Sequence, residues 1–318
     1  MNERLERIHA EFQTPEKTVA GFVTDEAGLH YQSREKIVAG EANEVYRIKA
    51  DEGDYTLRIA QRGEGDFAME KWAKETCANV GIPVTKTVKI DSLKTDKGLA
   101  QVSLEEFIPG KIPDIWNEPE ESWLPVFKEA GELLGKMHSI KVDGFGSLDA
   151  NGKGQYPDVR TYIKKDKIEH KDSFLAIAER HGIPKHLITN AIDELDKLSG
   201  KYNSTQAYFN HGDFAHKHFV VNRDGHIKAV LDFGCSEGAD PVKAFADWDF
   251  WFGEKCSSDI LRERYRNQEI FSDDFEEKKR MYGILKALDL IYYYDEIVDK
   301  PSMKVTVEKL KKLISAEK

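Results

Sequence analysis

The alternation of apolar and polar residues divides this sequence into a strand-rich first third and a helix-rich remainder. Strands are predicted where the two residue types alternate: 45–48, 55–59, 84–90 and 100–107. The turn-forming segment Asp51-Glu52-Gly53-Asp54 joins the first two strands and predicts a β-hairpin. Helices are predicted where apolar residues recur at helical spacing: 2–13 and 67–79. Gly81-Ile82-Pro83 is a typical helix end.

Helices dominate after a break at Ile108-Pro109-Gly110. They are predicted at 129–138, at 185–202 and several times within 260–318. One exception is a second hairpin, in which apolar runs flank the turn Asn222-Arg223-Asp224-Gly225. We therefore expect an α+β fold in two lobes. Residues 1–108 would hold an antiparallel sheet and a helix, and residues 109–318 a larger, mostly helical lobe with an embedded hairpin.

The residues around the second hairpin carry the strongest chemical signal. His211-Gly212-Asp213 precedes the hairpin, His218 follows Asp213 by five residues, and Asp232-Phe233-Gly234 comes directly after it. Phosphoryl-transfer sites of the kinase type use this order. One carboxylate orients or deprotonates the attacking hydroxyl, and a second one holds Mg²⁺ against the nucleotide phosphates. The order predicts Asp213 as the catalytic residue, with Asp232 and His218 as metal ligands.

The first third supplies candidate residues for the nucleotide. Arg58 lies near the end of the first hairpin, where kinases place a basic residue that pairs with phosphates. Glu70, twelve residues later on the predicted helix, is a suitable partner to orient it, although a solvated helix position is an equal alternative.

Two backbone segments are weaker candidates for nucleotide contact. The segment from Gly40 to Asn43 precedes the first hairpin and could cover the phosphates, or it could be a plain turn. The segment Glu105-Glu106-Phe107-Ile108 lies at the predicted lobe break. Its backbone groups could hydrogen-bond to a purine edge, or it could simply connect the lobes.

With these residues in view, the chain resembles the aminoglycoside phosphotransferase family, which also includes macrolide, hygromycin and choline-type kinases. The resemblance extends from about Val38 over nearly the whole remaining chain. Its motifs are Asn43-Glu44-Val45-Tyr46, Tyr55-Thr56-Leu57-Arg58-Ile59, Val80-Gly81-Ile82-Pro83-Val84, Phe107-Ile108-Pro109-Gly110, Leu134-Gly135-Lys136-Met137-His138, His211-Gly212-Asp213, and Asp232-Phe233-Gly234 with Asp240-Pro241. Two positions depart from the usual family pattern: His218 replaces an asparagine, and Arg58 replaces a lysine.

The resemblance implies a protein-kinase-like bilobal fold and a small-molecule kinase. Such an enzyme would transfer the γ-phosphoryl group of ATP or GTP, with Mg²⁺, to a hydroxyl of an aminoglycoside or related cationic antibiotic, and so confer antibiotic resistance. Asp213 would be catalytic, Asp232 the principal magnesium ligand, and Arg58 with Glu70 the nucleotide-side pair.

Composition limits the kinds of binding partner and the cellular location that we expect. The formal net charge is −10, whereas nucleic-acid binders are more often basic. No apolar run is long enough to span a membrane, and the charged N-terminus is unlike a signal peptide, so we expect a cytoplasmic protein. We also expect a monomer or a weak dimer. The three cysteines are far apart, which disfavours a disulfide framework or zinc knuckle.

Several alternatives remain open from sequence alone. A metabolite kinase of choline or sugar type, or a catalytically silent nucleotide-binding module, would share the same fold. A zinc site could use the histidines of the 211–218 segment, although further spaced ligands are lacking. Four acids after Asp232 could form a rim for a polyamine acceptor or simply a solvated helix face: Asp240, Asp247, Asp249 and Glu254. The interleaved aromatic residues are typical of a helix core.

Overall fold

The structure is a computed structural model that describes residues 3–38, 40, 42–61, 65–95 and 98–315. The chain forms two compact units: residues 1–112 with 218–234, and residues 113–217 with 235–318. The hairpin predicted near residue 220, although embedded in the sequence of the second part, thus belongs to the first unit.

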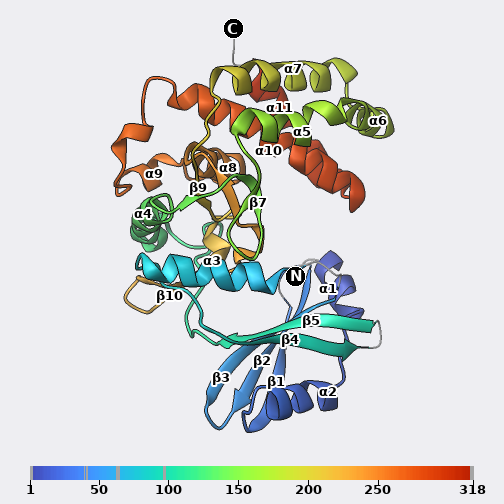
Figure 1. Cartoon of the computed structure of the whole chain (residues 1–318), viewed down its shortest axis with the longest axis vertical. Coiled ribbons are helices and arrows are strands. Elements are labelled where there is room, and N and C mark those ends of the chain that lie inside the picture. Colours follow the sequence, from blue (N-terminus) through green and yellow to red (C-terminus); the bar gives the residue numbers. More distant parts are fainter. Residues whose placement is uncertain (1–2, 39, 41, 62–64, 96–97, 316–318) are drawn as a thin grey trace. The chain divides into compact units, whose positions relative to one another are not determined.

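The first unit is built on an antiparallel sheet in the order β1-β2-β3-β5-β4 (Figure 1). Its strands are β1 (Tyr31–Ile37), β2 (Asn43–Ala50), β3 (Gly53–Ala60), β4 (Thr87–Thr95) and β5 (Gly98–Glu106). Its helices are α1 (Glu3–Ala10), α2 (Glu16–Gly21), the π-helical turn Phe22–Glu26 and α3 (Phe67–Asn79). The hairpin consists of β10 (Phe219–Val221) and β11 (Ile227–Val230).

Strand alternation explains the two faces of this sheet. Leu57 and Ile59 of β3 are fully buried in a core that also contains Val19 and Phe22, so α2 and the π-helical turn cover that face. Arg58, between them in sequence, points to the opposite face, which packs against α3. Asp66 caps the start of α3 by accepting a hydrogen bond from the amide of Met69.

The hairpin is joined to this unit by two isolated β-bridges. Lys111 pairs with Val221 of β10, and Val84 pairs with Val230 of β11. The predicted strand at 84–90 is therefore only partly correct: Val84 makes a bridge to the hairpin, and the regular strand β4 begins at Thr87.

The second unit contains a sheet that hydrophobic patterning did not predict. Its strands have the order β6-β9-β12-β7-β8 and are β6 (Lys141–Val142), β7 (Phe145–Leu148), β8 (Gly154–Tyr156), β9 (Ala207–Asn210) and β12 (Glu237–Ala239). Strands of two to four residues are too short to show a period of two, which is why they escaped notice.

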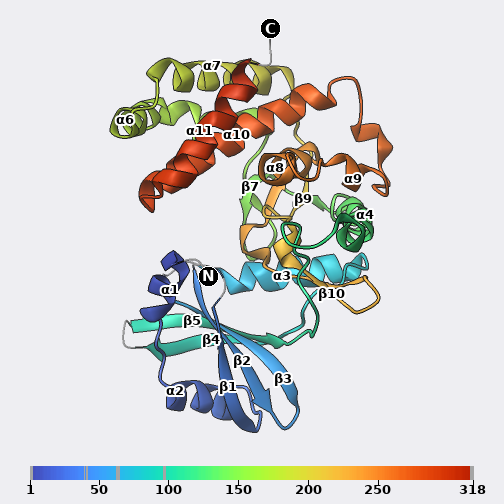
Figure 2. The same ribbon diagram turned by 180° about the vertical axis from the view of Figure 1, so that it is seen from behind.

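Helices make up most of the second unit, and Figure 2 shows the same ribbon from behind. They are α4 (Glu120–Met137), α5 (Val159–Asp166), α6 (Lys171–His181), α7 (Lys185–Lys201), α8 (Val242–Phe252), α9 (Asp259–Arg262), α10 (Phe275–Glu296) and α11 (Lys300–Ser315). Single 3₁₀ turns lie at Ile168–His170, His216–His218, Phe233–Cys235 and Gln268–Ile270. None of the helices in the described ranges is both long and apolar enough to cross a lipid bilayer.

Candidate active site

Arg58 and Glu70 form a two-point ion pair inside the first unit. One guanidinium nitrogen of Arg58 donates to Glu70 Oε1 at 3.1 Å, and the other donates to Oε2. Only 14% of the Arg58 side-chain surface and 4% of that of Glu70 are exposed. The structure thus brings together the two residues that the sequence proposed as partners, in the planar geometry that arginine and carboxylate favour.

A second acid and a second cation extend this pair. Glu105 Oε1 lies 3.6 Å from Arg58 and 2.8 Å from the ammonium of Lys74, and Thr85 donates to its other oxygen at 2.6 Å. Sequence reasoning missed the side chains of Glu105 and Lys74. The signal for Lys74 was available, because it follows Glu70 by four residues on α3 and so lies on the same helix face.

Burial and the neighbouring charges shift the pKa values of these side chains in opposite directions. Burial would lower the pKa of Arg58, but Glu70, Glu105 and Asp232 outweigh it and raise that pKa above its usual range. Burial raises the pKa of Glu70 even though Arg58 opposes it. Burial would also raise the pKa of Glu105, but Lys74 and Arg58 overcome it and the pKa is lowered.

Asp232 brings an exposed carboxylate to the same cluster. Its Oδ1 lies 3.7 Å from a guanidinium nitrogen of Arg58, and 50% of its side-chain surface is exposed. Its backbone has φ +63°, a conformation that non-glycine residues rarely adopt. Strain of this kind is characteristic of functional sites.

His218 lies next to Asp232, with 3.8 Å between its Nδ1 and Asp232 Oδ2. Among the described residues there is no group of three or more His, Cys, Asp or Glu side chains arranged to hold a metal ion. Magnesium does not require one, because it is often held by one or two carboxylates with water and substrate phosphates. The exposed Asp232 carboxylate fits such an ion.

Asp213 lies in the second unit, in the loop that follows β9. Its carboxylate is 2.7 Å from the ammonium of Lys217, and its amide donates to His211 Nδ1 at 3.3 Å. Gly212 is required here for two reasons: its φ is +76°, and a Cβ would lie only 1.8 Å from the carbonyl oxygen of Cys235. The loop backbone is therefore held tightly before Asp213.

The weaker nucleotide candidates all lie in the first unit. Gly40 has φ +72°, and Asn43 begins β2 opposite Ala60. The amide of Glu106, at the end of β5, already donates to the carbonyl of Lys86. The purine-binding role expected for the backbone of Glu106 and Ile108 stays a prediction.

The sequence profile of the phosphotransferase enzyme family (APH) matches residues 33–268, about three quarters of the chain. The chain belongs to this family. The match confirms the family predicted from the sequence. The protein is therefore a phosphotransferase. The comparison with curated proteins finds no match.

Solved structures with a similar fold confirm the kinase-like fold of this chain. A thermostable mutant of aminoglycoside phosphotransferase APH(4)-Ia, in ternary complex with ADP and hygromycin B, has a TM-score of 0.73 and 18% identity, over 94% of this chain and 99% of that one. The GDP complex of aminoglycoside 2'-phosphotransferase-IIIa has a TM-score of 0.65 and 16% identity, over 96% and 100%. A Haemophilus somnus 129PT protein provisionally assigned as a fructosamine-3-kinase has a TM-score of 0.66 and 17% identity, over 95% and 98%.

Proposed function

We propose that this phosphotransferase moves the γ-phosphoryl group of ATP or GTP to a hydroxyl of an aminoglycoside or a related antibiotic. The observation that carries the proposal is the buried Arg58–Glu70 pair with the exposed carboxylate of Asp232 beside it. A fixed cation next to a solvent-facing acid suits a magnesium–triphosphate group, because phosphoryl transfer depends mainly on positioning and charge neutralisation. The nucleotide complexes of the structurally similar enzymes support the same donor.

The residues of the chain then have distinct roles. Arg58, oriented by Glu70, binds phosphate oxygens, while Asp232, with His218 beside it, would hold Mg²⁺. Bound magnesium would neutralise charge on the phosphates. Asp213 accepts a hydrogen bond from the acceptor hydroxyl and aligns its oxygen with the γ-phosphorus. A bond forms between the acceptor oxygen and the γ-phosphorus, while the bond between the γ-phosphorus and the β–γ bridging oxygen breaks. The hydroxyl proton passes to the Asp213 carboxylate, and the nucleoside diphosphate leaves.

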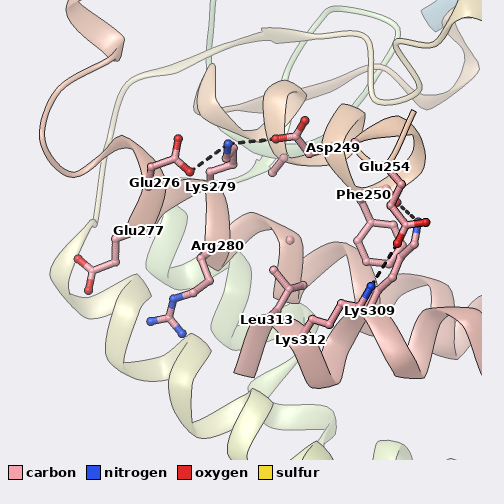
Figure 3. Close-up of a pocket in the computed structure, with 13 residues that line it drawn as sticks. Asp249, Phe250, Glu254, Glu276, Glu277, Lys279, Arg280, Lys309, Lys312 and Leu313 are labelled. Carbon is pink, nitrogen blue, oxygen red and sulfur yellow. Dashed lines mark hydrogen bonds and ion pairs between the residues drawn. The ribbon is translucent and has the colours of Figure 1, made fainter. Parts of the chain in front are cut away.

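We place the acceptor in a cavity of the second unit. It has a volume of about 760 Å³ and lies among α8, α10 and α11 (Figure 3). This volume falls within the usual range for small-molecule sites. Phe250 and Leu313 supply apolar surface. Of the four acids proposed as a rim, Asp249 and Glu254 line the cavity. Asp240 instead accepts from the amide of Val242, and Asp247 is paired with the buried Lys243.

The charges of this cavity favour one second candidate, a sugar-type metabolite kinase. Four acids and four cations line it: Asp249, Glu254, Glu276 and Glu277, with Lys279, Arg280, Lys309 and Lys312. Figure 3 shows Lys279 between Asp249 and Glu276, at 3.0 Å from each, and Lys312 pairs with Glu254. Because acidic and basic side chains are equal in number, this lining has no excess negative charge to attract a polycation. A sugar with few charges does not need such an attraction. The similar protein assigned as a fructosamine-3-kinase supports this candidate.

A phosphate-transfer assay distinguishes the two candidates. Purified protein with Mg²⁺ and either ATP or GTP is tested against aminoglycosides, hygromycin B, macrolides, choline and a fructosamine. Phosphorylation of an antibiotic, together with increased resistance of bacteria that express the chain, supports the first candidate. Phosphorylation of only the fructosamine supports the second. Absence of nucleotide binding in the presence of Mg²⁺ would overturn both.

A further inference from the structure

A histidine of the N-terminal helix is bound to the backbone between β1 and β2. Nε2 of His9 lies 2.9 Å from the carbonyl oxygen of Gly40. A carbonyl can only accept, so the ring proton is on Nε2 and donates to Gly40. The side chain is buried, with 3% of the residue exposed, and its Nδ1 has no hydrogen-bond partner among the described residues. Within the described part of the chain, the side chain of His9 thus makes one hydrogen bond, to the carbonyl of Gly40.

The strand before Gly40 is tied to the same N-terminal segment. The ammonium of Lys36 on β1 donates to the carbonyl of His9 at 2.7 Å and also to the carbonyl of Phe12. Arg34, on the same strand, donates to the carbonyl of Thr14 at 2.7 Å. These cations bond to carbonyl groups at the end of α1 and in the segment that follows it.

The strand after Gly40 is tied to this segment by a buried carboxylate. Glu44 on β2 is fully buried, and it accepts from the amide of Thr14 at 3.1 Å and from its hydroxyl at 2.6 Å. Tyr46 and Gln61 also donate to Glu44. Burial would raise the pKa of Glu44, but these hydrogen bonds lower it overall. A charged carboxylate with four donors is a strong anchor.

These contacts bind Gly40 and both neighbouring strands to residues 9–14. Lys36 lies four residues before Gly40, Glu44 lies four residues after it, and His9 contacts Gly40 directly. Gly40 itself has φ +72°, so its backbone adopts a conformation that glycine permits at little cost. The segment 9–14 thus contacts the carbonyl of Gly40 and is bonded to β1 and β2 in the free protein.

We propose that His9 is a positioning residue for the nucleotide, acting through the carbonyl of Gly40. The inference rests on the proposed function and on the expectation from the sequence that the backbone at Gly40 covers the nucleotide phosphates. Ordering that backbone in the free protein removes part of the entropy cost of binding. His9 therefore contributes to affinity for the nucleotide and leaves the acceptor site unaffected.

The test is binding of AMP-PNP, with Mg²⁺, to the full chain. Loss of one hydrogen bond in His9→Ala should weaken binding about 5- to 10-fold, equivalent to about 1 to 1.4 kcal/mol. KM for the nucleotide should rise by a similar factor while kcat stays the same. His9→Gln should restore binding, because its amide nitrogen can reach the position of Nε2. His30→Ala is the matched control, and no change in binding is expected. His30 is exposed, directly precedes β1 at the end away from Gly40, and is paired with Glu52.

The outcomes separate this inference from the proposed function. If the native chain binds AMP-PNP and His9→Ala binds it equally well, His9 has no positioning role and the proposed function stands. A His9→Gln variant as weak as His9→Ala would also overturn the inference, because the donor atom would then be irrelevant. If His9→Ala does not fold, Lys36→Met provides the second test, since it removes two hydrogen bonds to the same segment. Failure of the native chain to bind AMP-PNP overturns the proposed function and this inference together.

Discussion

Nε2 of His138 lies 3.2 Å from the side-chain oxygen of Asn210, the residue directly before His211-Gly212-Asp213. Because that oxygen accepts, the ring proton is on Nε2, and the hydroxyl of Tyr265 donates to Nδ1 across 2.8 Å. The ring is buried at the end of α4. His138 therefore connects α4 to the last residue of β9, from which the Asp213 loop begins.

This buried histidine should make stability depend on pH. Burial lowers the pKa of His138 from 6.5 to about 3, although Asn210 opposes the shift. Between these values the unfolded chain binds a proton that the folded chain does not, so the contribution to stability is complete above pH 6.5 and falls as the pH drops. The expected loss is about 1.4 kcal/mol for each pH unit below 6.5. Urea unfolding of the native chain and of His138→Asn, each at pH 7.5 and 5.5, isolates this contribution. An equal loss of stability in both proteins would contradict it.

Asp213→Asn should lower kcat strongly and leave nucleotide binding intact. The amide cannot take the hydroxyl proton, and loss of such a group reduces rates about 10²- to 10⁴-fold. Affinity for AMP-PNP with Mg²⁺ should change less than about twofold, because the assigned nucleotide groups lie elsewhere in the sequence. Lys217→Met removes an ion pair with Asp213 but should retain most activity, since the lysine is 56% exposed and such pairs contribute little. Normal turnover by Asp213→Asn would remove this residue from the mechanism.

Glu70→Gln should lower both stability and nucleotide affinity. The buried guanidinium of Arg58 would lose a charged partner, and breaking charged hydrogen bonds costs about 1.5–3 kcal/mol. Misorientation of Arg58 should then raise KM for ATP. A matched control is available on the same helix: Glu75 forms an exposed pair with Lys71, and Glu75→Gln should change stability by less than about 0.5 kcal/mol. Chemical denaturation and steady-state kinetics give both values, and equal effects at positions 70 and 75 would argue against the assigned role.

Two substitutions of Asp232 separate the role of its carboxylate from the cost of its backbone conformation. Asp232→Gly and Asp232→Ala both remove the carboxylate, so each should lose the increase in ATP affinity that Mg²⁺ provides. Only glycine relieves the cost of φ +63°, and Asp232→Gly should be about 1 kcal/mol more stable than Asp232→Ala. Calorimetric titration with and without Mg²⁺, followed by thermal unfolding, tests both statements. Retained magnesium dependence in either variant would mean that the ion is held elsewhere.

A bulky residue in the second-unit cavity should block the acceptor and spare the nucleotide. Leu313→Trp adds volume beside Phe250, so KM for the acceptor found in the assay above should rise at least tenfold, or about 1.4 kcal/mol. The same substitution at Leu99, which is 76% exposed on β5, controls for the added tryptophan. Unchanged acceptor kinetics in Leu313→Trp would move the acceptor away from this cavity.

The helices and strands with a clear sequence pattern were predictable, and they include the elements that carry Arg58 and Glu70. The helix predicted over 67–79 has those bounds in α3, and both hairpins form where turn residues separate alternating segments. α4 begins at Glu120 rather than 129, with Pro125 inside it. Pro125 leaves the carbonyl of Glu121 without its intrahelical donor, but Glu121 is exposed in the first turn, where water can satisfy that carbonyl.

The contacts that complete each site depend on tertiary structure. Glu105 was noted only as part of a connecting segment, yet its carboxylate joins Lys74 and Arg58. The tie between His9 and Gly40 spans 31 residues, and no local pattern predicts it. The bond between His138 and Asn210 spans 72 residues and joins a helix end to a strand of four residues. Such contacts arise from strand order and packing, which periodicity does not encode.

The chain passes between its units after Ile112, after Lys217 and after Gly234. During synthesis from the N-terminus, the local hairpins of the first sheet can pair early, whereas the bridges of Lys111 to Val221 and of Val84 to Val230 must wait for the second hairpin. Asp232 thus reaches Arg58 only after residues 113–217 have been made. Ribosome-bound chains stalled before residue 232 should carry the Arg58–Glu70 pair without the carboxylate of Asp232, so the ability to bind a magnesium nucleotide would appear late in translation.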